Sequence, residues 1–151
     1  MSQSLALLYV HLVFSTKGRK PFLADKGMRA ELWSVIGGIA NHLGSQSLIV
    51  GGTEDHVHIL ARQSKTVAPA DWIRDLKSNS SSWVKETDPR LADFAWQAGY
   101  GAFSVGPGGI ERVRQYIVDQ EAHHRKFSFQ DELRAILREH GVTPDEAHLW
   151  D

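Results

Sequence analysis

Two histidines one residue apart mark the most informative stretch of the sequence, "GGTEDHVHIL" (Gly51 to Leu60). Side chains alternate across a strand, so His56 and His58 project from the same face. Two neutral imidazoles on one face are nitrogen ligands for a divalent first-row metal ion. The alternative, on these residues alone, is a surface pair that only hydrogen-bonds to Glu54 or Asp55. Either acid is also a candidate to fix the histidine tautomers, and Asp55 is equally suited to a hairpin turn.

A second stretch, "ERVRQYIVDQEAHHRK", adds a phenol, an amide and further imidazoles at helical spacing. At about 100° per residue, Tyr116, Gln120 and His123 share a stripe at the border of an apolar seam. The side-chain carbonyl of Gln120 can supply a third metal ligand and leave positions open for substrate oxygens. Beside a cation that polarises a phosphodiester, Tyr116 can attack phosphorus and exchange one phosphodiester for another.

Other roles for these residues remain open. Tyr116 on its own is also typical of a boundary residue that packs its ring and wets its hydroxyl. His123 and His124 fit cations at a helix C-terminus, which the helix dipole favours, better than metal ligands. His11, on an apolar strand, is either structural or a contact to a ligand, and its position does not separate the two.

Length and composition limit the class of protein. With 151 residues and 42% hydrophobic residues, the chain is long enough for one domain with its own core, and we expect a single domain over 1–151. Zero cysteines exclude a disulfide scaffold and a cysteine-based zinc site, and they suit the cytoplasm. The N-terminal apolar run is too short to span a bilayer and has no basic region before it, so neither a membrane span nor an export signal is expected.

Strands and helices alternate along the chain. Hydrophobic periodicity and cap residues predict strands at 8–16, 47–50, 56–60 and 94–105, and helices from Asp25 to Gly44, from Pro69 onward, at 110–124, and from Ser128 to Gly141. The short connection between 47–50 and 56–60 is typical of a hairpin, which requires antiparallel pairing. We therefore expect an α+β fold, a largely antiparallel sheet covered by helices.

Several blocks together resemble one protein family. "DHVHIL" resembles the His-hydrophobic-His signature of HUH endonucleases, and "YIVDQEAHH" resembles the tyrosine-helix motif of the single-tyrosine HUH transposases. These are the IS200-like enzymes of bacterial insertion sequences and the REP-associated tyrosine transposases. "FSTKGRKPFL", "DLKSNSSSW" and "WQAGYGAFSV" are similar to the intervening blocks in the same order, so the resemblance runs from about Tyr9 to Gly141.

The resemblance implies a ferredoxin-like HUH fold and a reaction. His56, His58 and Gln120 would bind Mg²⁺ or Mn²⁺, and Tyr116 would form a 5′-phosphotyrosine on single-stranded DNA and free a 3′-hydroxyl. Family members recognise DNA hairpins and act as homodimers. In many of them the tyrosine helix completes the partner's site, and the spacing in this chain does not decide whether that holds here.

The charge balance is unusual for a DNA-binding protein, because the net charge is −1. Phosphate binding is local, however, and the cations cluster near the motifs. Those that we expect to contact DNA are Lys17, Arg19, Lys20, Arg62, Lys77 and Arg114. Such a protein would be cytoplasmic and associated with the nucleoid when bound. Three rivals to a transposase remain: a hairpin-binding protein that cleaves poorly, a non-covalent metal phosphoesterase built on His56 and His58, and a purely structural module.

Overall fold

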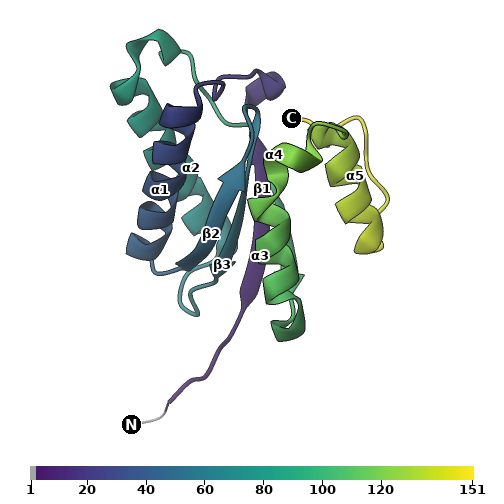
Figure 1. The fold of residues 1–151 in the computed structure, drawn as a ribbon. Coiled ribbons are helices and arrows are strands. Elements are labelled where there is room, and N and C mark those ends of the chain that lie inside the picture. Colours follow the sequence, from purple (N-terminus) through teal and green to yellow (C-terminus); the bar gives the residue numbers. More distant parts are fainter. Residues whose placement is uncertain (1–2) are drawn as a thin grey trace.

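A four-stranded antiparallel sheet forms the middle of the molecule, with helices on both of its faces (Figure 1). The structure is a computed structural model that describes residues 3–151. The strand order is β2-β3-β1-β4, with every neighbouring pair antiparallel. The strands are β1 (Tyr9–Ser15), β2 (Gln46–Gly52), β3 (His56–Arg62) and β4 (Gly101–Val105). This architecture confirms the α+β expectation.

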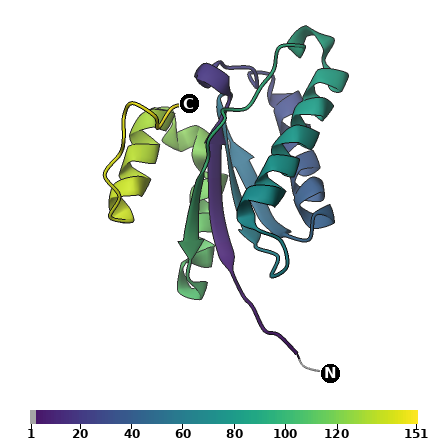
Figure 2. The same ribbon diagram turned by 180° about the vertical axis from the view of Figure 1, so that it is seen from behind.

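The helices divide between the two faces of the sheet, as Figures 1 and 2 show from opposite sides. One face carries α1 (Lys26–His42) and α2 (Pro69–Thr87). The other carries α3 (Ile110–Val118), α4 (Gln120–His123) and α5 (Phe129–Glu139). Short 3-10 turns lie at Lys17–Arg19, Pro89–Leu91 and Pro107–Gly109. Among residues 3–151, no helix has the length and apolar character needed to cross a bilayer.

The alternation of side chains along the central strands separates a core from a site. Leu12 and Phe14 of β1 and Val57 and Ile59 of β3 are fully buried in the large apolar cluster under α1 and α2. Their neighbours in sequence face α3 and α5 instead. On that second face a smaller cluster holds α5 against β1 and β4, and its buried members are Val13, Phe103, Phe129, Leu133 and Ile136. The histidines of β1 and β3 lie on this second face.

Most predicted boundaries hold, for reasons visible in the caps. The Asp25 carboxylate accepts hydrogen bonds from the amides of Gly27 and Met28 at 2.9 and 3.1 Å, as expected for the residue that begins α1. The Ser128 hydroxyl accepts a bond from the Asp131 amide at 3.1 Å and begins α5. The predicted hairpin is also confirmed, because β2 and β3 pair directly across a short turn.

The predicted strand over 94–105 is wrong in its first half. Only Gly101–Val105 forms a ladder, and Trp96 makes one isolated bridge, to Thr16. Phe94 and Trp96 are buried in the core, which explains their strand-like apolar pattern. At Gln97 the side-chain oxygen accepts the Ser15 amide at 2.8 Å, so a side chain takes over part of the pairing that a strand would provide.

The predicted helix over 110–124 is present but interrupted. Asp119, with φ −88° and ψ 12°, separates α3 from α4. The amides of His123 and His124 still bond to the carbonyls of Asp119 and Gln120 at 2.9 and 3.0 Å, so the helical course resumes directly.

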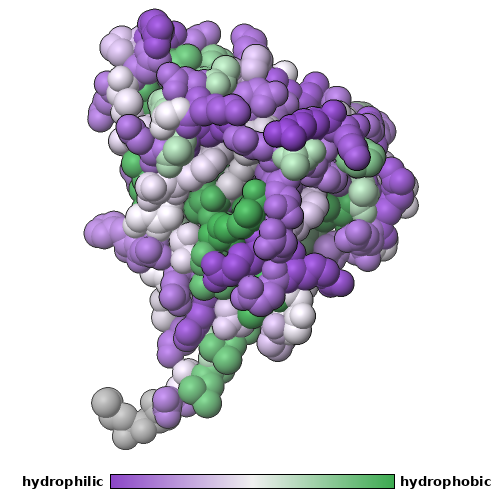
Figure 3. All heavy atoms as spheres, in the orientation of Figure 1, coloured by the Kyte–Doolittle hydropathy of each residue, from purple (hydrophilic) through white to green (hydrophobic). Residues whose placement is uncertain are grey.

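Part of the molecular surface is apolar. Figure 3 shows it in the middle of one face, over the edge strand β2 between α1 and α3, and along the extended segment before β1. In that segment Leu5, Leu7 and Leu8 are all exposed. β2 is an edge strand of the sheet, and its only strand neighbour among residues 3–151 is β3.

Candidate functional site

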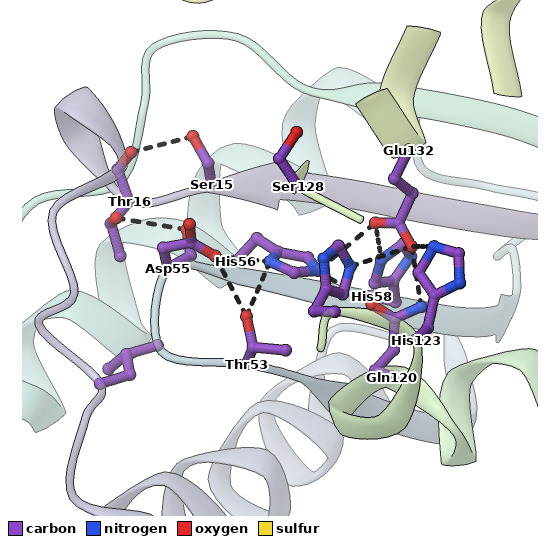
Figure 4. A network of polar contacts seen from close by, with 12 residues as sticks. Ser15, Thr16, Thr53, Asp55, His56, His58, Gln120, His123, Ser128 and Glu132 are labelled. Atoms are coloured by element: carbon purple, nitrogen blue, oxygen red, sulfur yellow. Dashed lines mark hydrogen bonds and ion pairs between the residues drawn. The ribbon is translucent and has the colours of Figure 1, made fainter. Parts of the chain in front are cut away.

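A buried carboxylate stands at the centre of the site. Glu132 projects from α5 towards β3, and Figure 4 shows it above His58 and Gln120. One oxygen, Oε1, lies 2.8 Å from His58 Nε2 and 3.4 Å from His56 Nε2. The other, Oε2, accepts a hydrogen bond from Gln120 Nε2 at 2.9 Å and another from the hydroxyl of Tyr116. The groups that the sequence singled out on β3 and on the tyrosine helix therefore meet within one chain.

His56 is fully buried and is oriented by the hairpin turn. Its Nδ1 lies 2.7 Å from Asp55 Oδ1 and 3.0 Å from Thr53 Oγ1, while Nε2 lies 2.9 Å from Gln120 Oε1. Burial opposes protonation, but the hydrogen bonds to Asp55 and Glu132 raise the pKa of His56 to about 9. Of the two acids before the histidines, Asp55 is the one that fixes the ring.

His58 is oriented from the neighbouring strand. Its Nδ1 lies 2.8 Å from Nε2 of His11, which is buried on β1. Burial lowers the pKa of His58, and burial together with His58 lowers the pKa of His11 to about 3. Desolvation therefore disfavours the protonated form of both rings. This contact gives His11 a structural role in the site.

His123 and His124 turn inward, although they lie at the C-terminal end of α4 as expected. Their Nε2 atoms lie 3.4 and 3.1 Å from Glu132 Oε2. Both atoms are buried, and neither has a hydrogen bond of acceptable geometry. Buried polar atoms without partners are rare, so these imidazoles require a further explanation. Both residues lie at the helix end as expected, and their rings face the Glu132 carboxylate.

The donor set fits a divalent cation. Nitrogens of His56, His58 and His124 and an oxygen of Glu132 all lie within 4.8 Å of one another. Burial raises the pKa of Glu132, but the electrostatic interaction with His58 and the hydrogen bonds to His56 and His58 hold that pKa far below its usual range, so the group is a carboxylate at neutral pH. Imidazole nitrogens with one carboxylate oxygen form a coordination set for first-row transition metals.

Tyr116 is half-buried at the edge of this cluster. Burial and the charge of Glu132 raise its pKa well above the usual range, so the phenol is protonated in this arrangement. A cavity of about 630 Å³ opens beside it, between β4, α3 and α5. Its lining includes His11, Phe103, Arg112 and His140. The hydroxyl therefore lies next to a space that a substrate can enter.

A glycine allows the tyrosine helix to lie close to the sheet. A Cβ added at Gly51 in β2 would lie 2.8 Å from both Cγ2 and the carbonyl oxygen of Ile117. Ile117 is the residue after the candidate nucleophile and is itself buried. Because β2 has no side chain at this point, α3 can approach near enough for Tyr116 to reach Glu132.

The predicted DNA-contacting cations differ in their surroundings. Lys17, Lys20 and Arg62 are exposed, and the Arg19 guanidinium lies 5.6 Å from the ring centre of Trp150. Arg114 donates to the Leu48 carbonyl at 3.1 Å. Lys77 differs, because its ammonium donates to the carbonyls of Gln97 and Gly99 at 2.9 and 2.6 Å and so ties α2 to the segment before β4.

Sequence reasoning missed Glu132. A signal did exist, because Glu132 lies three residues after Phe129 and one before Leu133, on the apolar stripe of α5. An acid on the buried face of an amphipathic helix is costly unless it is paired. That pattern indicates that polar or charged side chains pair with the buried acid, but it does not identify them.

Comparisons with known proteins give a consistent result. The fold is similar to a crystal structure of a protein assigned as a transposase in Deinococcus radiodurans R1, with 23% identity, a TM-score of 0.61, and coverage of 80% of this chain and 98% of that one. It is also similar to a REP-associated tyrosine transposase bound to a REP hairpin, with 12% identity, a TM-score of 0.58, and coverage of 82% and 74%. At these identities the likeness shows a shared fold.

Comparison of sequences shows the family as well as the fold. No curated protein sequence matches the chain. The family described as "Transposase IS200 like" matches residues 4–120, which include the histidine pair, Tyr116 and Gln120 and end before His124 and Glu132. Because this match spans most of the 151 residues, the chain belongs to the IS200-like transposase family.

Proposed function

We propose that this transposase cleaves and rejoins single-stranded DNA at hairpin-flanked ends through a covalent 5′-phosphotyrosine on Tyr116. The observation that carries the proposal is the meeting of Tyr116, Gln120, His56 and His58 in one chain beside a cavity of about 630 Å³. Membership of the family supports the transposase role. We propose His56, His58 and Gln120 as ligands of Mg²⁺ or Mn²⁺.

The chain's own groups account for the bond changes. The Tyr116 oxygen attacks phosphorus, the bond from phosphorus to the 3′ oxygen breaks, and the released oxygen takes a proton to become a 3′-hydroxyl. The phenol proton has an acceptor in place, because the hydroxyl already donates to Glu132 Oε2. In the reverse reaction a 3′-hydroxyl attacks the phosphotyrosine and restores the phenol, so rejoining needs no nucleotide cofactor.

Charge decides when the phenol can react. The carboxylate of Glu132 and burial both disfavour a phenolate in this arrangement. A bound divalent cation would supply positive charge at the substrate phosphate and so offset that penalty. The imidazoles of His56 and His58 are held in place by Asp55 and His11, which keeps their Nε2 atoms directed at the cluster.

A DNA hairpin is the partner that we propose. The REP-associated transposase with a similar fold was solved bound to a REP hairpin. In this chain the exposed cations Lys17 and Lys20 and the partly exposed Arg19 follow β1, and Arg112 lines the cavity beside Tyr116. Homodimer formation, a single domain over 1–151 and a cytoplasmic location stay predictions. One chain already brings the named site groups together.

The test is covalent capture. Wild-type protein incubated with single-stranded hairpin DNA and Mn²⁺ should give a protein–DNA adduct that survives denaturation. Tyr116→Phe should give none, and Tyr100→Phe, which changes an exposed tyrosine, should give the wild-type amount. An undiminished adduct in Tyr116→Phe would reject the assignment of the nucleophile.

A second candidate is a hairpin-binding protein that cleaves poorly. The hydrogen bond from Tyr116 to Glu132 favours it, because that bond and the raised pKa keep the phenol protonated. Tight hairpin binding without any adduct, across metals and across single-stranded substrates, would favour this candidate over strand transfer.

A further inference from the structure

We propose that Glu132 and His124 are themselves metal ligands, so that three imidazoles and one carboxylate join Gln120 at the centre, which prefers Mn²⁺ and other first-row transition ions to Mg²⁺. The inference rests on the proposed function and deepens it, because it names two further ligands and the class of ion. Neither residue lies within the part of the chain that matches the family, which ends at Gln120.

The distances suit a single ion. The four candidate ligand atoms, from His56, His58, His124 and Glu132, lie within 4.8 Å of one another. Ligands on one ion lie up to about 4.2 Å apart, because each bond is about 2.1 Å long. Shifts of a few tenths of an ångström in the side-chain positions would therefore bring all four atoms within bonding distance of one ion.

The unpartnered imidazole is the second observation. His124 Nε2 is buried and points at Glu132 Oε2 from 3.1 Å, yet it makes no hydrogen bond of acceptable geometry. A buried polar nitrogen left without a partner is destabilising. A protonated His124 would form an ion pair with the carboxylate across this distance. A neutral ring with its proton on Nδ1, towards the Phe127 carbonyl, would instead direct its Nε2 lone pair at the carboxylate, and a cation bound to both would remove that repulsion.

The elements that carry the two ligands are anchored. Glu132 lies between Phe129 and Leu133, and both are buried against β1 and β4. His124 follows α4 directly, and its Nδ1 lies 2.7 Å from the Phe127 carbonyl oxygen. If that nitrogen carries the proton, Nε2 keeps its lone pair for the ion. The C-terminal segment thus holds both donors in place before a metal arrives.

The donor types set the preference among ions. Mg²⁺ favours oxygen ligands and retains several waters, whereas imidazole suits Mn²⁺, Co²⁺ and Zn²⁺. Three imidazole nitrogens among the donors therefore disfavour Mg²⁺. Gln120 also positions the carboxylate, because its Nε2 donates to Glu132 Oε2 at 2.9 Å while its Oε1, the proposed ligand atom, lies 2.9 Å from His56 Nε2.

Metal titration without DNA tests the inference. Metal-stripped full-length protein is titrated with Mn²⁺ by calorimetry, and free Mn²⁺ is followed by electron paramagnetic resonance. Wild type should bind one equivalent, with Mg²⁺ at least a hundredfold weaker. Glu132→Gln and His124→Ala should each weaken Mn²⁺ binding tenfold or more. The matched controls Glu86→Gln, an exposed acid of α2, and His148→Ala, an exposed histidine, should stay within twofold of wild type.

The outcomes separate the two proposals. Circular dichroism in chelator establishes that each variant is folded, and Glu132→Asp replaces Glu132→Gln if the latter is not. Folded variants that bind Mn²⁺ like wild type, a wild type that binds no metal, or equal affinity for Mg²⁺ would overturn the inference. If Tyr116→Phe kept the adduct while Glu132→Gln and His124→Ala lost affinity for Mn²⁺ as expected, the proposed function would fail and the ligand assignment would stand.

Discussion

The hydroxyl of Tyr116 on α3 donates a hydrogen bond to the carboxylate of Glu132 on α5, so the proposed nucleophile faces a buried acid across the site. The two residues are 16 positions apart and belong to helices that meet only in the folded chain. The same carboxylate contacts His58 through its other oxygen, at 2.8 Å. The acid therefore links the phenol to the histidine pair.

Removing the charge of Glu132 should make Tyr116 easier to ionise. In Glu132→Gln we expect the pKa of Tyr116 to fall by roughly 1 to 3, the range over which a neighbouring charge acts, and to remain above that of a free tyrosine because burial persists. Ultraviolet titration in chelator, with Tyr116→Phe as the blank, measures the change. An unchanged titration curve would show that the carboxylate does not control the phenol.

Stability should fall as pH rises through the titration of His56. The folded-state pKa of about 9 lies above the unfolded value, so the stabilisation is fully present below about pH 6.5 and is lost as the pH approaches 9. With 1.36 kcal/mol for each pKa unit, the loss is about 3 kcal/mol. Urea unfolding in chelator at several pH values measures it. His56→Asn should lack this loss, and equal pH dependence in the two proteins would contradict the assignment.

Two inactive variants should not rescue each other. His58→Ala and Tyr116→Phe damage groups that one chain brings together, so mixed proteins would contain no intact site. We expect the mixture to form no more adduct with hairpin DNA than either variant alone. Recovery of adduct towards a quarter or half of the wild-type level would mean that the tyrosine helix serves a partner's histidines.

A methyl group on Gly51 should separate α3 from β2. In Gly51→Ala the new Cβ meets Ile117 at 2.8 Å, so we expect a loss of about 1–3 kcal/mol of stability and a weaker adduct. Gly38→Ala is the matched control, because its Cβ meets nothing within 4 Å and alanine favours the helix. Thermal unfolding and adduct yield report the two effects. Wild-type values for both in Gly51→Ala would refute the packing argument.

The predicted phosphate contacts should separate by salt dependence. Replacing Lys17, Arg19 and Lys20 with alanine should reduce the slope of log affinity against log salt by about 2, at roughly 0.7 for each contact. Lys77→Ala should leave that slope unchanged and lower the melting temperature, because its ammonium holds backbone carbonyls. Hairpin-binding titrations at several salt concentrations and thermal unfolding distinguish these results.

Local rules were enough to predict part of the site. Alternation along a strand places His56 and His58 on one face, and helical spacing places Tyr116 and Gln120 on one stripe. Both relationships depend on neighbours in sequence, so they could be predicted before the fold was known. They survive the break at Asp119, because the helical hydrogen bonds resume after it.

The remaining groups depend on contacts between distant segments. His11 reaches His58 because β1 pairs with β3 in one particular register, and Glu132 reaches both histidines because α5 folds back over the sheet. The strand predicted from residue 94 fails for the same kind of reason. Phe94 and Trp96 are apolar because they fill the core, and Gln97 bonds to Ser15 of β1 through both its amide and its side-chain oxygen without extending the ladder.

The position of Glu132 late in the chain has a consequence during protein synthesis. Residues emerge from the ribosome in order, and the strands that carry His11, His56 and His58 are made long before α5. A nascent transposase that has already exposed its tyrosine still lacks the acid that gathers the imidazoles. Translation products that stop short of residue 132 would thus carry Tyr116 without the carboxylate that His58, Gln120 and the phenol contact.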